Sequence, residues 1–172
     1  KTAGTSAAGQ PLPQPTIKPL VLCKDGLADL KWGCTRASLS GLELKPTDSG
    51  LKDVTEYVRP NDLLKLDGAT LITAVYAFWR DQFYTVSIWT RGREDFMALR
   101  DKVFEHFGPG SRIDGADEKY LWSNSTTDVM LKYTHDDQYG LLWMRAKELD
   151  RKLKLSQLNS HTSYLRRLKT IQ

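Results

Sequence analysis

Residues 69–91, ATLITAVYAFWRDQFYTVSIWTR, have a high content of β-branched and aromatic residues. This pattern predicts two long strands joined by a tight turn. With Asp81-Gln82 as the two turn residues, Arg80 pairs with Phe83, and the register follows from that pair. One face then carries Val75, Val86 and Ile88, and the other carries four aromatic residues: Tyr76, Phe78, Phe83 and Trp89. Neither face is plainly polar, although an antiparallel sheet usually keeps one face in water.

A second hairpin is predicted further along the chain. Residues 127–134 alternate apolar and polar positions, HDDQ forms a turn, and YGLLWM returns as the partner strand. Pairing Thr134 with Tyr139 places Met130 opposite Trp143 and Lys132 opposite Leu141. This hairpin therefore also has a second side that is largely apolar.

Between the hairpins the hydrophobic period changes from two to that of a helix. In REDFMALRDKVFEHFGPG, Phe96, Leu99, Val103 and Phe107 fall on one helical face, and Gly108-Pro109 ends the segment. We expect this helix to cover the face of the first hairpin that carries Val75, Val86 and Ile88. From Arg145 the chain is helical again, and the polar NSHTS interrupts this second helix.

This order of elements predicts an α+β fold with a mainly antiparallel, twisted sheet of about five to seven strands and helices packed on one side. The predicted organisation is a Pro/Ser/Gly-rich tether over residues 1–19, a single domain over 20–158 and a basic tail over 159–172. No segment has the roughly 20 apolar residues of a membrane-spanning helix. A tether of this composition is typical of exported bacterial proteins, so we expect a periplasmic or otherwise exported protein whose signal segment is absent from this chain.

The net charge of +4 is unevenly distributed. Residues 145–172 contain eight Lys/Arg and two Asp/Glu, a net of +6, and residues 1–24 add +3, so residues 25–144 carry −5. A basic tail on an acidic body is not the evenly basic surface of a nucleic-acid-binding domain. The tail or the tether could bring the protein close to an anionic membrane surface.

No residue set identifies a reaction. The sequence has no nucleophile elbow, no phosphate-binding glycine loop and no metal-ligand spacing, so we expect a protein that is not an enzyme and needs no cofactor. Cys23 and Cys34 are eleven residues apart, which allows a disulfide in an oxidising compartment or leaves two thiols in a reducing one.

If the two hairpins share one sheet, their second faces join into one aromatic patch, made of Tyr76, Phe78, Phe83, Trp89, Met130, Leu141 and Trp143. A monomer seldom leaves so large a patch in water. Either the N-terminal strand or the C-terminal helix, through Leu149, Leu153 and Leu158, covers it, or it binds a partner: a second copy, another protein or an apolar ligand. A shift of the register by one residue would exchange the two faces.

Four features occur in order along residues 25–144: DGLADLKWGCTRASL, the long hairpin, a helix ending in FEHFGPG, and a YLW strand. In this order the chain resembles a loose group of uncharacterised exported bacterial proteins with an Asp-Gly to Trp-Gly opening. The resemblance supplies no catalytic residues. We therefore expect a non-catalytic exported protein that binds a protein partner, possibly itself, or an apolar ligand through the patch. The alternative is a nucleic-acid-binding module that uses Tyr76, Phe78, Phe83 and Trp89 for stacking and the basic tail for phosphates.

Overall fold

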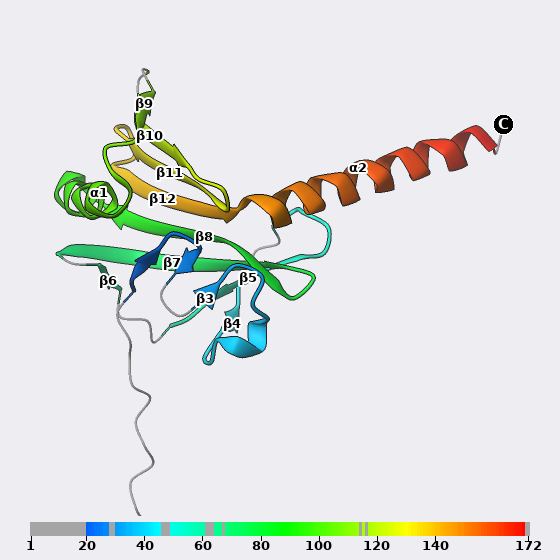
Figure 1. Cartoon of the computed structure of the whole chain (residues 1–172), viewed down its shortest axis with the longest axis horizontal. Helices are drawn as coiled ribbons and strands as arrows, with labels where there is room; N and C mark the ends of the chain where they lie inside the picture. Colours follow the sequence, from blue (N-terminus) through cyan, green and yellow to red (C-terminus); the bar gives the residue numbers. More distant parts are fainter. Residues whose placement is uncertain are drawn as a thin grey trace, which may run out of the picture.

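The computed structural model describes residues 20–27, 30–45, 49–60, 64–66, 68–113, 115 and 117–170, with side chains as far as residue 158. The predicted tether over residues 1–19 lies outside the described residues. The α+β fold class is confirmed, because two helices accompany a mainly antiparallel sheet (Figure 1). The main sheet has nine strands among the described residues, more than the five to seven expected, because short edge strands extend both of its sides.

The order of the main sheet runs from one edge to the other as follows: β4 (Glu43–Leu44), β5 (Val54–Val58), β7 (Ala69–Trp79), β8 (Gln82–Arg91), β12 (Tyr139–Ala146), β11 (Thr127–Thr134), β10 (Glu118–Ser123) and β9 (Ser111–Ile113). The ninth strand, β6 (Lys65–Leu66), pairs with the start of β7. A separate three-stranded sheet contains β1 (Leu22–Cys23), β2 (Gly26–Leu27) and β3 (Leu30–Lys31). A 3-10 turn over Arg36–Ser38 follows it.

The turn between β7 and β8 lies one residue earlier than the sequence predicted. Trp79 pairs with Gln82, so the turn residues are Arg80 and Asp81, with φ angles of 49° and 63°. Two consecutive positive φ angles are typical of a type I′ turn, whose twist suits a hairpin. After Phe83 the register shifts, because Tyr84 is an additional residue in β8 and forms a β-bulge. A second irregularity lies at Ile72 in β7.

The bulge changes which residues share a face of the sheet. Beyond it, Val86 pairs with Tyr76, and Trp89 pairs with Thr73 instead of the expected Ala74. Because neighbouring residues in a strand point to opposite faces, Trp89 lies on the face opposite to Tyr76. The second hairpin has the predicted register: Thr134 pairs with Tyr139 and Met130 with Trp143.

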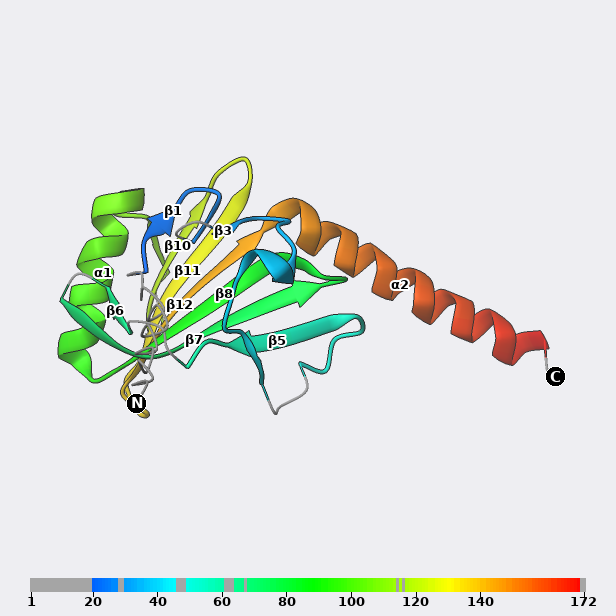
Figure 2. The ribbon, with the colours of Figure 1, turned by 90° about the horizontal axis from the view of Figure 1, so that it is seen from below.

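The main core lies on the face of the sheet that contains Tyr76. Helix α1 (Arg93–Phe107) covers this face with Phe96, Leu99 and Val103, all fully buried. The sequence predicted that this helix covers the face with Val75, Val86 and Ile88. Val86 and Ile88 do lie on the covered face, but Val75 belongs to the opposite face. Four leucines of the N-terminal segment also join this core: Leu20, Leu22, Leu27 and Leu30. Figure 2 shows α1 and the small sheet beside each other over the same sheet.

The chain after β3 completes the edge of β8. Strand β12 pairs with β8 only as far as Thr85, because the chain then leaves the sheet to begin α2. The amide of Gly33 donates to the carbonyl of Phe83 at 2.8 Å, and the amide of Phe83 donates to the carbonyl of Cys34 at 2.9 Å. The N-terminal segment thus satisfies backbone groups of β8 that would otherwise lack a neighbouring strand.

Helix α2 (Lys147–Thr170) packs on the opposite face of the sheet. Leu149 and Leu153 are buried against Ala77, Trp79 and Tyr84 in a second, smaller cluster. The helices therefore lie on both sides of the sheet, not on one side as predicted. The helix also continues through NSHTS without a break, so the segment expected as a tail over 159–172 is helical as far as Thr170. In both ribbon views α2 runs away from the sheet (Figures 1 and 2).

Candidate binding surface

The structure separates the seven residues expected to form one patch. Tyr76, Phe78 and Phe83 are at most 2% exposed and lie in the main core, where Phe83 contacts the Trp32 ring at a centroid distance of 5.0 Å. The other four lie on the opposite face of the sheet: Trp89, Met130, Leu141 and Trp143. The prediction of one continuous seven-residue patch was therefore wrong. The physical reason is the bulge at Tyr84, which reverses the alternation along β8 between Phe83 and Trp89.

The four residues nevertheless belong to a continuous apolar surface. The strand register aligns Val58, Val75, Ser87, Trp143, Met130 and Leu121 in one row across β5, β7, β8, β12, β11 and β10. Trp89 and Leu141 are paired in the next row. We call this set the open-face patch: Val58, Val75, Trp89, Leu121, Met130, Leu141 and Trp143. Val58, Val75 and Leu121 were not expected in the patch, although the alternation in VTEYV and in YLW is a signal that could have placed Val58 and Leu121 there.

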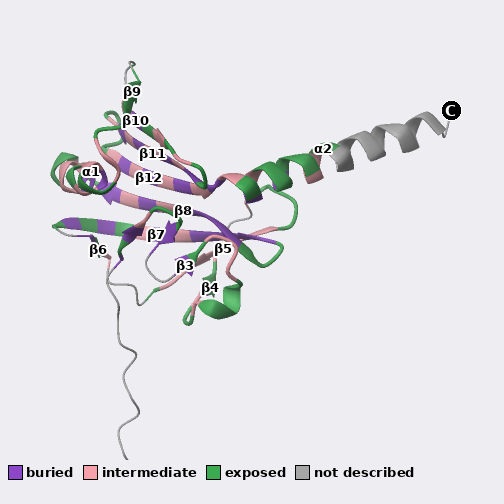
Figure 3. Ribbon diagram, in the orientation of Figure 1, coloured by how far each residue is buried: buried purple, intermediate pink, exposed green. Residues whose placement is uncertain are grey.

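The open-face patch is accessible to solvent. Leu121 is 36% exposed, and the other six residues are partly exposed. Among the described residues, neither of the two buried clusters includes any member of the patch, even as a partly buried neighbour. Figure 3 shows β11 and β12 alternating between buried and intermediate residues along their length. Residues 127–134 and 139–146 thus bury one face and leave the other partly exposed.

Charged residues border the patch and are paired with one another. Arg145 contacts Asp128 and Asp150, each at 3.0 Å, and its guanidinium lies 4.9 Å from the centroid of the Trp143 ring. Lys132 contacts Asp117 at 2.7 Å. Because these ion pairs are partly exposed, each adds little to stability. An apolar centre with a polar border is the usual composition of a protein-binding surface.

The pKa values of these carboxylates agree with their pairing. Burial favours a higher pKa for Asp128, but hydrogen bonds from Ser123 and Arg145 outweigh it, so the pKa lies below its usual value. The hydrogen bond from Lys132 lowers the pKa of Asp117. Both carboxylates are therefore ionised at neutral pH, and the border of the patch keeps its charge pattern.

Another charged cluster joins α1 to β10, on the far side of the sheet from the patch. Glu118 accepts a hydrogen bond from the Tyr120 hydroxyl at 2.8 Å and pairs with Arg93 at 2.5 Å and Arg100 at 3.5 Å. Burial favours a higher pKa for Glu118, but Tyr120 and the two guanidinium groups outweigh it and hold the pKa below its usual value. This arrangement fixes the helix to the sheet.

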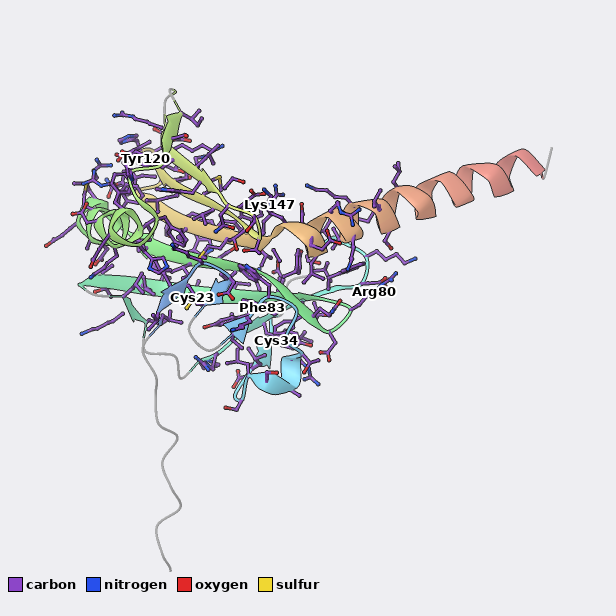
Figure 4. All side chains as sticks on the ribbon, in the orientation of Figure 1. Cys23, Cys34, Arg80, Phe83, Tyr120 and Lys147 are labelled. Carbon is purple, nitrogen blue, oxygen red and sulfur yellow. The ribbon has the colours of Figure 1, made fainter. Side chains whose placement is uncertain are left out.

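The two cysteines are present as thiols and are not joined by the disulfide that their spacing allows. Burial raises the pKa of the Cys34 thiol, which keeps it protonated and poorly nucleophilic. Figure 4 shows Cys34 close to Phe83, as expected from the hydrogen bond that the Phe83 amide donates to the Cys34 carbonyl, and Cys23 on the small sheet. In the part of the chain that the structure describes, no group of three or more His, Cys, Asp or Glu residues is arranged to hold a metal ion.

The stacking platform of the nucleic-acid alternative is not formed as predicted. It required Tyr76, Phe78 and Phe83 beside Trp89, and the first three are enclosed in the core. Of the expected platform, Trp89 alone remains accessible, packed edge to face against Tyr139 at 6.5 Å. The four-residue platform that the sequence predicted is therefore not available for base stacking.

Comparison of the chain with protein-family models, with curated proteins and with solved structures found no match. Neither helix of the described chain is long and apolar enough to cross a membrane. The geometry of the open-face patch is therefore the main evidence on which a function can be argued.

Proposed function

We propose that this protein is a non-catalytic binding protein that holds a protein partner on the open-face patch. The observation that carries the proposal is the row from Val58 to Leu121, which crosses six strands, is apolar on all of them except β8, where Ser87 lies, and is not covered by the described part of the chain. Burial of apolar surface is worth about 25 cal/mol per Å². Covering this row by a partner is therefore favourable, and two of its members, Trp143 and Met130, are residue types enriched at interfaces.

The structure of the sheet suits such a role. The opposite face is fully occupied by α1 and the N-terminal leucines, so the fold does not need the patch for its core. Strands β11 and β12 are flanked by other strands on both sides, which fixes the positions of Met130, Leu141 and Trp143. A rigid surface loses little conformational entropy when a partner binds.

The test is purification of the tagged full-length chain from its native cells, in wild-type form and as the double variant Met130→Thr, Leu141→Thr. Threonine suits a β-strand, so this variant keeps the fold while making the patch polar. The matched control is Ile72→Thr, because Ile72 is also a strand residue, is 44% exposed and lies outside the patch. We expect a stoichiometric protein partner with the wild type and the control and its loss from the double variant. Equal recovery from all three chains, or no partner in any, would refute the proposal.

We also propose that the protein acts after export from the cytoplasm. The proposal is supported by the Pro/Ser/Gly-rich composition of residues 1–19 and by the resemblance of residues 25–144 to exported bacterial proteins. Fractionation of the native cells is the test. Recovery in the periplasmic or envelope fraction is expected, and recovery in the cytoplasmic fraction alone would contradict it.

A further inference from the structure

Three cations of the open face lie on the side of the patch that is away from α2. The strand register pairs Lys119 of β10 with Lys132 of β11, and Lys132 with Leu141 of β12. Arg91, at the end of β8, is two residues beyond Trp89 and therefore points to the same face. We call these three residues the basic border: Arg91, Lys119 and Lys132. All three are at least partly exposed, directly beside the apolar residues of the patch.

The basic border has more positive charge than its surroundings neutralise. Asp117 contacts Lys132 at 2.7 Å, and within the described part of the chain this is the one ion pair that any of the three cations makes. The Arg91 guanidinium lies 5.8 Å from the centroid of the Tyr139 ring. Three cations and one carboxylate leave a net charge of +2 here, although residues 25–144 as a whole carry −5.

The register also places two like charges directly opposite each other. Lys119 and Lys132 are cross-strand partners on one face, and such a pair disfavours the association of β10 with β11. Asp136 and Asp137, in the turn after β11, are exposed to water and form no ion pair with either lysine among the described residues. The repulsion is therefore a cost to the isolated chain that an anion from outside would relieve.

We infer that the partner held on the open-face patch is another protein whose contact surface presents carboxylates beside apolar side chains. The inference rests on the proposed function, since it states the chemistry of the partner of that surface. Carboxylates placed at the basic border form charge-assisted hydrogen bonds with its ammonium and guanidinium groups. The apolar side chains bury the patch, while the charges orient the partner and exclude proteins with a basic surface.

The spacing of the sheet allows one contact surface to use both parts. Neighbouring strands are about 4.8 Å apart, so Lys132 is one strand and Lys119 two strands, roughly 10 Å, from Leu141. Trp143 is two residues from Leu141 along β12, a distance of about 7 Å. A standard interface covers about 800 Å² on each partner, which is wider than these separations. A single partner therefore covers the apolar residues and the cations together.

A second copy of the chain matches this surface less well. The carboxylates on the described open face already have cationic partners: Glu56 with Lys45 at 2.6 Å, Asp128 with Arg145 at 3.0 Å and Asp117 with Lys132 at 2.7 Å. An open face turned towards another open face would therefore bring no unpaired carboxylate from these residues to the basic border.

A nucleic acid also matches the surface less well. Its affinity for a protein comes from many phosphate contacts, whereas the basic border offers three cations on a body with a net charge of −5. Most of the aromatic residues expected to stack on bases are enclosed in the core. A protein with acidic and apolar groups matches both parts of the surface.

The experiment treats the tagged full-length chain with a carbodiimide in an extract of its native cells. This reagent joins an ammonium group to a carboxylate in contact with it, and mass spectrometry identifies the linked residues. The wild type is compared with Lys119→Gln, Lys132→Gln and with Lys119→Arg, Lys132→Arg, which keeps the charge but lacks the reactive amine. The control is Lys31→Gln, Lys65→Gln, because both are exposed strand residues outside the open face. Circular dichroism verifies that each variant is folded.

We expect amide links from Lys119 or Lys132 of the wild type to Asp or Glu residues of a different protein. We also expect the double Gln variant at these positions to recover roughly tenfold less of that protein. The double Arg variant, which forms no such links, and the control recover as much as the wild type.

Recovery of the protein without such links, or equal recovery by the double Gln variant, would overturn the inference. The proposed function would survive that result if Met130→Thr, Leu141→Thr still loses the protein. Links to a second copy of the chain alone would also overturn the inference without contradicting the proposed function. If nucleic acid, lipid or nothing is recovered in place of a protein, both fail.

Discussion

Leu141 and Leu142 are neighbours in β12, and the structure assigns them to opposite faces of the sheet. Leu142 is completely buried between Leu131 and Ile88, which are also completely buried. Leu141 belongs to the open-face patch and is partly exposed. We therefore predict that Leu→Ala lowers the free energy of unfolding by different amounts at these two adjacent positions.

The size of each loss in unfolding free energy follows from the atoms that the substitution removes and from how far they are buried. At position 142 the change deletes three carbon atoms from a close-packed core, which costs about 3 kcal/mol or more, including the cavity that remains. At position 141 part of the side chain is already in water, so the cost is below about 1 kcal/mol. For a chain of this size, 3 kcal/mol lowers the midpoint of thermal unfolding by about 6 to 12 °C.

The assay is urea denaturation followed by tryptophan fluorescence, at a protein concentration low enough for the monomer to predominate. The condition matters because loss of a dimer contact would add to the cost at position 141. Equal costs at the two positions, or a greater cost for Leu141→Ala, would refute the assignment of the two faces and with it the existence of an open-face patch.

Other predictions concern the core, the helix attachment and the covered end of the sheet. Gly140→Ala would place a methyl group 2.8 Å from the Phe96 ring, so we expect a loss of about 1 to 3 kcal/mol in urea denaturation, whereas Gly115→Ala, which has open space, leaves stability nearly unchanged. Burial and nearby carboxylates raise the pKa of Tyr84 to about 12, so the free energy of unfolding falls as pH rises from about 10 to 12, and Tyr84→Phe removes that decrease. The pKa of Glu118 is lowered on folding, so its contribution is present above pH 4.5 and is lost as pH falls further; a Glu118→Gln chain with the same acid dependence as the wild type would contradict this.

The part of the fold that could be predicted from the sequence is the part whose local pattern is regular. In the β11–β12 hairpin a four-residue turn separates two strands with clear alternation, and no bulge interrupts either strand. The pairing of Met130 with Trp143 therefore followed directly from the position of the turn. Helix α1 was also recognisable, because its apolar spacing and its terminal glycine agree.

The β7–β8 hairpin was less predictable because contacts from elsewhere in the chain determine its turn. Arg80 and Asp81 are not glycine or asparagine, yet both have positive φ angles. The backbone amide of Arg80 donates to the carbonyl of Asp53 at 3.0 Å, and its guanidinium contacts the Asp53 carboxylate at 3.1 Å and Ser156 of α2 at 3.2 Å. Figure 4 shows Arg80 beside α2 at the tip of the hairpin. No local pattern records these contacts.

The bulge at Tyr84 explains the error in the candidate site. The alternation does not reveal this bulge, so the prediction put Trp89 on the same face as Tyr76. The earlier turn by itself moves each pairing partner by two residues and leaves the faces unchanged. Three core aromatics were consequently assigned to the surface. The four residues that remain on the patch were grouped correctly with one another, because three of them belong to the regular β11–β12 hairpin and Trp89 pairs directly with Leu141.

The most direct test of the open-face patch as a protein-binding surface is photo-crosslinking from the patch itself. A benzophenone amino acid replaces Trp143 in the full-length chain, and in a control it replaces Leu44, which is 65% exposed and lies outside the patch. After irradiation in the native cells, the adducts are identified by mass spectrometry. We expect a specific protein adduct from position 143 that is absent from position 44. The absence of any protein adduct from position 143, or the same adducts from both positions, would contradict it.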